Sequence, residues 1–223
     1  MTKIIVIGAK GRMGQRIIAR LKENPALKLA GEVDLGDSLE KVLGSADVFI
    51  DFSSAETTVS NLQTAAKLGK AAVIGTTGHS PAQKKEIEAL SKKIPIVMAP
   101  NMSVGVNVLW KIIADAARLL GADYDVGIVE THHTQKKDSP SGTALKAAEV
   151  LKKQTSKEIQ IQAFRGGDVV GDHTVTFWGN GERLEITHQA TSRDTFALGA
   201  LRAAQWIVGK PNGLYSMADV LGI

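Results

Sequence analysis

The stretch that decides the fold is Lys3-Ile-Ile-Val-Ile-Gly-Ala-Lys-Gly-Arg-Met-Gly14. It opens with a short apolar run ending at Ile7, and such runs are typical of strands buried on both faces of a parallel sheet. Gly8 is placed to make a tight turn, Gly11 to let the backbone approach a pyrophosphate, and Gly14 to let a helix pack closely on the strand. The residues that follow have the apolar spacing of a helix. The stretch therefore predicts a strand, a glycine turn and a helix, the unit that holds a dinucleotide.

An acidic residue after the next predicted strand, 27–33, fits the same ligand. Asp34 comes 34 − 14 = 20 residues after the last glycine of the turn, where a carboxylate can hold the ribose hydroxyls of adenosine. Leu35 follows it instead of an arginine for a 2′-phosphate, although Lys10 and Arg12 could partly supply that charge. We therefore expect NADH to be used and NADPH to be tolerated. The expected cofactor contacts here are Gly8, Ala9, Lys10, Gly11, Arg12, Met13, Gly14 and Asp34.

The alternation of strands and helices continues to about residue 100. Further strands are predicted at 48–52, 71–74 and 96–99, with helices from about 38, over 56–67 and from about 81. Repeats of this length predict a Rossmann-type, doubly wound parallel sheet, in which ligands bind beyond the carboxyl ends of the strands. The turns after the last two strands could line the nicotinamide half of a dinucleotide, and ordinary turn chemistry explains them equally well. The residues concerned are Gly75, Thr76, Thr77, Ala99, Pro100, Asn101 and Met102.

A different pattern follows a long helix predicted over 104–120. Strands are expected at 125–131, 158–164, 173–178 and 183–189, the last two joined by a Gly-Asn-Gly hairpin turn, with one helix at 143–153. This indicates a second, α+β substrate domain on a mixed sheet. We expect residues 165–168 and 171–173 to form a surface loop rather than a ligand site. Helices at 196–208 and 217–221 return to the first domain, so residues 1–103 and 194–223 form the dinucleotide-binding domain and 104–193 the substrate domain.

The densest chemistry lies in Glu-Thr-His-His-Thr-Gln-Lys-Lys-Asp-Ser-Pro-Ser-Gly-Thr-Ala, residues 130–144. Histidine transfers protons near neutral pH, and a lysine beside an anion site can bind charge or act as an acid. Ser141 is a plausible helix N-cap, so the next two backbone N–H groups would favour a carboxylate or phosphate. Adjacent histidines can also be metal ligands, but no third His or Cys stands nearby at ligand spacing, and we expect no metal. The lysine pair could equally be solvated surface charge.

Composition narrows the class of protein. The charge of 27 − 23 = +4 suits anionic small molecules, and with only 4% aromatic residues nucleic-acid binding is not expected. Cysteine is absent, which excludes disulfides, thiol nucleophiles and zinc–thiolate sites. The first residues look like neither a signal peptide nor an anchor, and no apolar run reaches the length of a membrane span. We expect a cytoplasmic protein with a small-molecule substrate.

Taken together, these motifs resemble those of the dihydrodipicolinate reductase family over essentially the whole chain. The motifs are the glycine turn at 8–14, Gly-Thr-Thr-Gly at 75–78, Ala-Pro-Asn at 99–101, the long stretch at 130–144, and Glu-Arg-Leu-Glu-Ile-Thr-His at 182–188 leading to Ser-Arg at 192–193. The long stretch is highly specific, whereas the glycine motif is generic. Met102 stands where the family often has phenylalanine, and the missing arginine after Asp34 leaves the choice between NADH and NADPH open.

The resemblance implies reduction of 4-hydroxy-tetrahydrodipicolinate to tetrahydrodipicolinate with NADH or NADPH, in lysine and diaminopimelate biosynthesis, by a homotetramer built through the substrate-domain sheets. By position in the motif, His132 would be the acid/base residue and Lys136 the proton donor. The implied substrate contacts are His133, Ser141, Gly142, Thr143 and Arg193. Two rival functions remain open: an NAD(P)-binding sensor that performs no reduction, and a dehydrogenase of another imine or amino acid.

Overall fold

The computed structural model describes all 223 residues and divides into two compact units. The first unit comprises Met1–Val104 and Asp194–Ile223, and the second Gly105–Arg193. The chain thus passes from the first unit to the second after Val104 and returns to the first after Arg193. None of the helices is both long enough and apolar enough to cross a membrane.

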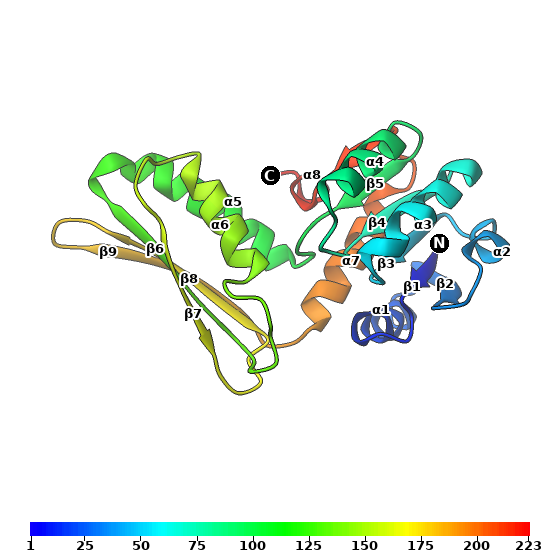
Figure 1. The fold of residues 1–223 in the computed structure, drawn as a ribbon, viewed down its shortest axis with the longest axis horizontal. Helices are drawn as coiled ribbons and strands as arrows, with labels where there is room; N and C mark the ends of the chain where they lie inside the picture. The colour runs from blue at the N-terminus through cyan, green and yellow to red at the C-terminus, as the bar shows by residue number, and fades with distance from the viewer. The chain divides into compact units, whose positions relative to one another are not determined.

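The first unit is built on one parallel sheet (Figure 1). Its strands are β1 (Thr2–Ile7), β2 (Leu27–Val33), β3 (Val48–Asp51), β4 (Ala71–Ile74), β5 (Pro95–Met98) and β10 (Gly213–Tyr215). Its helices are α1 (Arg12–Lys22), α2 (Leu39–Leu43), α3 (Ala55–Leu68), α4 (Pro81–Ser91), α7 (Asp194–Ile207) and α8 (Met217–Leu221). The strand order is β10-β5-β4-β3-β1-β2, and every pair is parallel. The predicted doubly wound sheet is confirmed.

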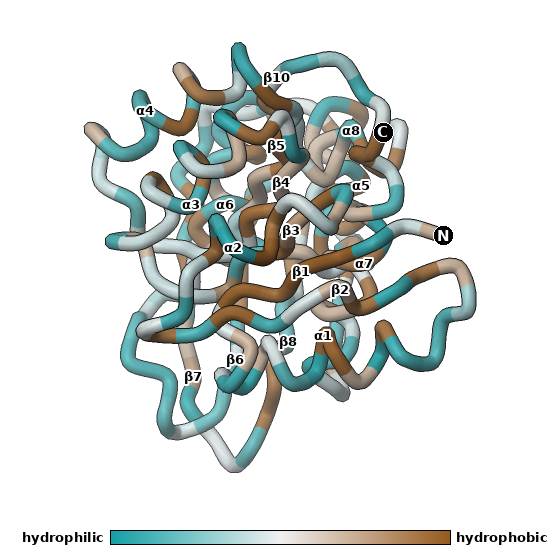
Figure 2. Tube along the Cα trace, turned by 90° about the vertical axis from the view of Figure 1, so that its right-hand side faces the viewer, coloured by the Kyte–Doolittle hydropathy of each residue, from teal (hydrophilic) through white to brown (hydrophobic).

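The apolar runs form strands because both faces of the sheet are covered by helices. Side chains alternate across a strand, so Ile4 and Val6 of β1 pack in the core shared with α1 and α7. Ile5 and Ile7 of β1 pack in the core under α2, α3 and α4. Burying one such side chain stabilises the fold by roughly 1.5–3 kcal/mol. Figure 2 shows the resulting apolar traces of β1, β3, β4 and β5.

The glycine turn needs its glycines for geometric reasons. Gly8 has φ of 76°, the left-handed region, and a Cβ there would lie 2.6 Å from the carbonyl oxygen of Phe52. A Cβ at Gly14 would meet the turn itself, lying 2.7 Å from Cα of Ala9. The first turn of α1 therefore packs directly on the loop that precedes it.

The second unit holds a four-stranded mixed sheet with two helices on one face (Figure 1). Its elements are α5 (Val104–Leu120), β6 (Asp125–His132), α6 (Gly142–Lys152), β7 (Gln160–Arg165), β8 (Gly171–Trp178) and β9 (Arg183–Ala190). The strand order is β7-β6-β8-β9, where β6 and β7 are parallel and the other pairs antiparallel. Apolar side chains of α5 and α6 pack on this sheet. The predicted α+β unit on a mixed sheet is confirmed.

One local expectation was wrong, one strand was missed, and the buried face of one helix was not identified from the sequence. The strand β10 was missed because it has only three residues and no alternating pattern. Residues 171–173 are the start of β8 rather than a loop, and β8 pairs there with β9. In α5, the apolar positions Val108, Ile112 and Leu119 are exposed. Helix α5 is apolar on more than one side, so spacing alone does not identify its buried face, which is formed by Val106, Leu109, Trp110, Ile113 and Ala117.

Candidate functional site

A hollow of about 480 Å³ lies at the carboxyl ends of β1, β2 and β3, large enough for part of a dinucleotide. Gly8 and Gly11 of the glycine turn line it, as do Asp34 and Asp37 after β2. The predicted cofactor residues Gly8, Gly11 and Asp34 therefore lie around one hollow. The contribution of Phe52, Ser53 and Ser54, which follow β3, was missed, although the rule that ligands bind at strand carboxyl ends could have indicated it.

The carboxylate of Asp34 is fixed by the backbone. Its Oδ2 accepts a hydrogen bond of 2.7 Å from the N–H of Lys10, and its Oδ1 accepts one of 2.8 Å from the N–H of Leu35. These two bonds hold the pKa of Asp34 below its usual range, so the group is ionised. Asp37 accepts in turn from the N–H of Asp34. Two acids thus line the hollow, which favours hydroxyl donors over a phosphate.

The other predicted cofactor residues divide into exposed and buried positions. Thr77 and Pro100 are exposed, while Ala9, Ala99 and Met102 are buried in the core, where only their backbones could reach a ligand. Met13 packs against the same core, and Lys10 and Arg12 are exposed. Gly75 lies against the ring of Phe52, which leaves no room for a Cβ. The side chain of Asn101 accepts a hydrogen bond from the N–H of Ser103.

Buried Asp51, at the end of β3, ties two of these turns together. Its Oδ1 accepts from the N–H of Ser53 at 2.8 Å and from the hydroxyl of Thr76 at 3.0 Å. Its Oδ2 accepts from the side-chain amide of Asn61 at 3.1 Å. Thr76 therefore uses its hydroxyl inside the protein and supports the turn rather than pointing freely outward.

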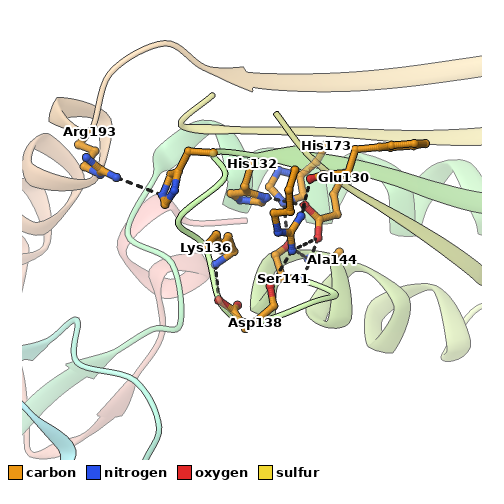
Figure 3. Close-up of polar contacts among 11 residues, drawn as sticks. Glu130, His132, Lys136, Asp138, Ser141, Ala144, His173 and Arg193 are labelled. Carbon is orange, nitrogen blue, oxygen red and sulfur yellow. Dashed lines mark hydrogen bonds and ion pairs between the residues drawn. The ribbon is translucent and has the colours of Figure 1, made fainter. Parts of the chain in front are cut away.

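In the second unit, His132 at the end of β6 is paired with a buried acid (Figure 3). Its Nδ1 lies 2.5 Å from Oε2 of Glu130, which is wholly buried. The two side chains share one face of the strand because they are two residues apart. Arg165 of β7 donates to both oxygens of Glu130 at 3.0 Å, and the N–H of Ser141 donates to Oε1 at 3.0 Å.

These contacts determine the charge states. Burial raises the pKa of Glu130, but its hydrogen bonds with Arg165, His132 and Ser141 more than offset this and leave the pKa below its usual range. Burial lowers the pKa of His132 more than the interaction with Glu130 raises it. At neutral pH, Glu130 is therefore an anion and His132 is neutral.

Lys136, in the turn after β6, lies 2.9 Å from Oδ1 of Asp138, and its side chain is 22% exposed (Figure 3). Burial raises the pKa of Asp138, and its hydrogen bond and ion pair with Lys136 outweigh this, so the pKa lies below its usual range. Arg165 also donates to the carbonyl oxygen of Asp138 at 2.6 Å. The same arginine therefore holds both the Glu130 carboxylate and the turn that carries Lys136.

The predicted N-cap of α6 is confirmed, since Oγ of Ser141 accepts from the N–H of Ala144 at 3.2 Å. This leaves Gly142 and Thr143 in the first turn of the helix, where the macrodipole favours an anion. The same Oγ lies 3.1 Å from Nε2 of His173 on β8. Burial lowers the pKa of His173 to about 4, so this ring is neutral at neutral pH.

Arg193, the last residue of the second unit, is near the other predicted histidine. Its guanidinium donates to Nε2 of His133 at 3.2 Å. Because arginine is only a donor, Nε2 of His133 is the acceptor and its other nitrogen carries the proton.

The structure thus brings His132, Lys136, Ser141 and the start of α6 together around Glu130 and Arg165. The sequence reasoning missed Glu130, Arg165, His173 and Asp138 as members of this cluster. Glu130 could have been found from strand period, since it precedes His132 by two residues. Arg165 and His173 come from strands whose pairing with β6 only the fold decides.

Comparisons with known proteins match this chain to one family along nearly its full length. Residues 2–102 match a model described as "Dihydrodipicolinate reductase, N-terminus", and residues 105–221 match "Dihydrodipicolinate reductase, C-terminus". The chain is 45% identical over 266 residues to a 4-hydroxy-tetrahydrodipicolinate reductase of Anaeromyxobacter dehalogenans strain 2CP-1, covering 100% of this chain and 98% of that protein. It is also 45% identical over 265 residues to a protein of the same name from Geobacter metallireducens, covering 100% of both.

A solved structure described as dipicolinate-bound dihydrodipicolinate reductase from Paenisporosarcina sp. TG-14 has a TM-score of 0.85 at 23% identity, with 98% of each chain covered. An amine dehydrogenase from Mycobacterium smegmatis has a TM-score of 0.69 at 12% identity, with 97% and 95% covered. These two likenesses concern the fold. From the family models and the full-length identities, we conclude that this chain belongs to the dihydrodipicolinate reductase family.

Proposed function

We infer that the protein is a 4-hydroxy-tetrahydrodipicolinate reductase, an NAD(P)H-dependent oxidoreductase of lysine and diaminopimelate biosynthesis. The observation that carries this conclusion is the identity of 42–45% with reductases of that name, over the full length of this chain. The Glu130–His132 pair and Lys136 supply the proton chemistry that such a reaction needs, which a sensor without catalysis would not require.

The reaction removes the 4-hydroxyl as water together with a proton of the neighbouring ring carbon, adds a hydride to the carbon that carried the hydroxyl, and returns a proton to the neighbouring carbon. A reduced nicotinamide dinucleotide supplies the hydride when it is bound. We assign the proton donation to Lys136, whose ammonium carries a proton beside the ion-pairing carboxylate of Asp138. We assign acid/base exchange to His132, a neutral imidazole whose Nδ1 is occupied by Glu130.

The substrate carries two carboxylates, and the second unit offers two places for anions. One is the first turn of α6, where Ser141 caps the helix and Gly142 and Thr143 follow. The other is Arg193 with its partner His133. The dipicolinate-bound relative supports a site for a pyridine dicarboxylate in this fold.

The residues of the first unit fit a dinucleotide. The glycine turn at Gly8 and Gly11 and the carboxylate of Asp34, which line one hollow, are the features such a ligand needs. We propose that NADH binds with its ribose hydroxyls on Asp34, and that NADPH binds less tightly because Asp34 and Asp37 repel a 2′-phosphate. Exposed Lys10 and Arg12 lessen that repulsion, so NADPH is still used.

We also propose a homotetramer assembled through the sheets of the second unit. Large apolar side chains lie exposed on the sheet face opposite α5 and α6: Val129 at 41%, Phe164 at 58% and Trp178 at 45% exposure. A patch of this kind marks an association surface. Assembly through it would leave the Glu130 cluster at the end of β6 within each subunit.

The experiment that tests the function is a coupled assay in which dihydrodipicolinate synthase supplies the unstable substrate. Oxidation of NADH and NADPH is followed side by side by nicotinamide absorbance. We expect rapid oxidation with NADH, slower oxidation with NADPH, and loss of both in His132→Ala and Lys136→Ala. A folded protein that binds NADH but does not oxidise it in this assay would contradict the reductase assignment.

A further inference from the structure

The ring of His132 has neighbouring residues on three sides. Glu130 contacts Nδ1 at 2.5 Å, and the ring of His173 makes an edge contact with a centroid distance of 5.1 Å and an interplanar angle of 77°. On the third side lies Gly171, the first residue of β8. A Cβ at Gly171 would lie 2.8 Å from Nε2 of His132 and 3.2 Å from its Cδ2.

Gly171 is not demanded by its backbone, which is outside the left-handed region. The three atoms nearest to a Cβ at this position all belong to the ring of His132. The ring cannot yield cheaply, because moving it would break the bond between Nδ1 and Glu130. The absent side chain at 171 therefore keeps the space beside Nε2 open.

Glu130 determines which ring nitrogen carries the proton. As an ionised carboxylate it is only an acceptor, so Nδ1 of His132 must donate to it. Its other partners are also obligate donors: the guanidinium of Arg165 and the N–H of Ser141. In the neutral ring, Nε2 is then the nitrogen without a proton.

We propose that Glu130 and Gly171 are positioning residues for the acid/base step of His132, Glu130 by fixing the proton on Nδ1 and Gly171 by leaving the approach to Nε2 open. This rests on the proposed function, which gives His132 that step. The charged and titratable groups that act on the ring are Glu130 of β6, Arg165 of β7, His173 of β8 and Lys136 of the turn after β6.

The variant Glu130→Gln tests the first part by a specific change of tautomer. If the amide NH₂ took the place of Oε1, it would face two groups that can only donate, Ser141 N–H and the guanidinium of Arg165. In the place of Oε2 it faces one N–H of Arg165 and the ring of His132, which can accept a hydrogen bond. The amide should therefore donate to His132, whose proton moves to Nε2. Histidine ring ¹⁵N shifts in the full-length protein, without substrate, report this directly.

In the wild type, we expect the neutral ring of His132 to be protonated at Nδ1, and in Glu130→Gln at Nε2. The variant should lose at least about tenfold in kcat, within the range of acid/base groups, while KM for NADH changes by less than about twofold. Its pH–rate profile should shift to lower pH, since the anion that raised the pKa of His132 is gone. An unchanged tautomer, or a changed tautomer with unchanged kcat, overturns the role of Glu130.

Gly171→Ala tests the second part, and Gly166→Ala is its matched control. Gly166 lies near the same strand end and donates to the carbonyl oxygen of His132, but a Cβ there would meet nothing within 4 Å. We expect Gly171→Ala to lose at least about tenfold in kcat and Gly166→Ala to lose less than about twofold, with KM for NADH kept in both. Equal kcat in the two variants overturns the role of Gly171.

A failure of the acid/base assignment of His132 can be distinguished from a failure of the positioning role of Glu130. If His132→Ala keeps the full rate, the proposed function of His132 is wrong, yet the ¹⁵N shifts still show whether Glu130 fixes its tautomer. If His132→Ala is inactive while Glu130→Gln is fully active, the acid/base assignment stands and the positioning role falls.

Discussion

Lys136 is the residue whose proposed role separates most cleanly from binding. Its ammonium pairs with Asp138, and in Lys136→Ala the proton donor is lost while the hollow for the cofactor, in the other unit, is untouched. We expect kcat to fall by about 10²- to 10⁴-fold, the usual contribution of an acid, with little change in the Kd of NADH. Steady-state rates and NADH fluorescence titration measure the two quantities.

Lys137→Ala is the control for that variant, because Lys137 is the exposed neighbour of the same charge. It should keep nearly the full rate. Equal losses of rate and NADH affinity in Lys136→Ala would remove Lys136 from the catalytic role.

His173 makes stability depend on pH. Burial lowers its pKa from 6.5 to about 4, so between these values the unfolded chain takes up a proton that the folded ring does not. Above pH 6.5 the residue has no such effect. As pH falls from 6.5 to 4, it should lower the free energy of unfolding by up to about 3 kcal/mol.

Chemical unfolding across this range, in the wild type and in His173→Gln, measures the effect. Glutamine keeps a polar group for Ser141 but does not titrate, so the variant should lose less stability than the wild type on acidification. If the free energy of unfolding fell equally with pH in the wild type and in His173→Gln, another group would be responsible.

At the scale of elements, α6 combines a structural cap with a proposed anion site. Ser141→Ala removes the hydroxyl that accepts from Ala144 N–H, which should cost about 1 kcal/mol of stability. It also loosens the helix start, so KM for the substrate should rise severalfold. Urea unfolding and the coupled assay check the two effects.

The control is Ser216→Ala at α8, where Ser216 also caps a helix by accepting from a backbone N–H. This variant should lose similar stability without any change in KM for the substrate. A rise in KM of the same size in both variants would mean that lower stability alone explains it.

At the scale of the whole molecule, the exposed apolar face of the second sheet predicts assembly. Trp178 is 45% exposed, and its ring lies over Gly127 of the neighbouring strand. In Trp178→Glu, a charge replaces the apolar ring and would be buried at the proposed interface without a partner, which is costly. We expect light scattering after size exclusion to give a tetramer for the wild type and smaller species for the variant.

Lys111→Glu, also a surface change of charge in the second unit, serves as the control, because Lys111 is on helix α5, which covers the opposite face of the sheet. This variant should remain a tetramer, because the new charge lies away from the exposed apolar face. A wild type that runs as a monomer would contradict the proposed assembly.

The sequence by itself determined the parts of this protein that depend on local spacing. An apolar run predicted β1, glycine positions predicted the turn before α1, and Ser141 predicted the cap of α6, because strand burial, backbone conformation and capping each act within a few residues. The motif at 130–144 pointed to His132 and Lys136 as candidate catalytic residues. The tertiary structure alone decided which side chains of other strands join them, since Arg165 and His173 reach Glu130 and His132 only through the pairing of β7 and β8 with β6. It also decided that Gly171 faces His132, because contacts between strands distant in the chain follow from register and burial rather than from local composition.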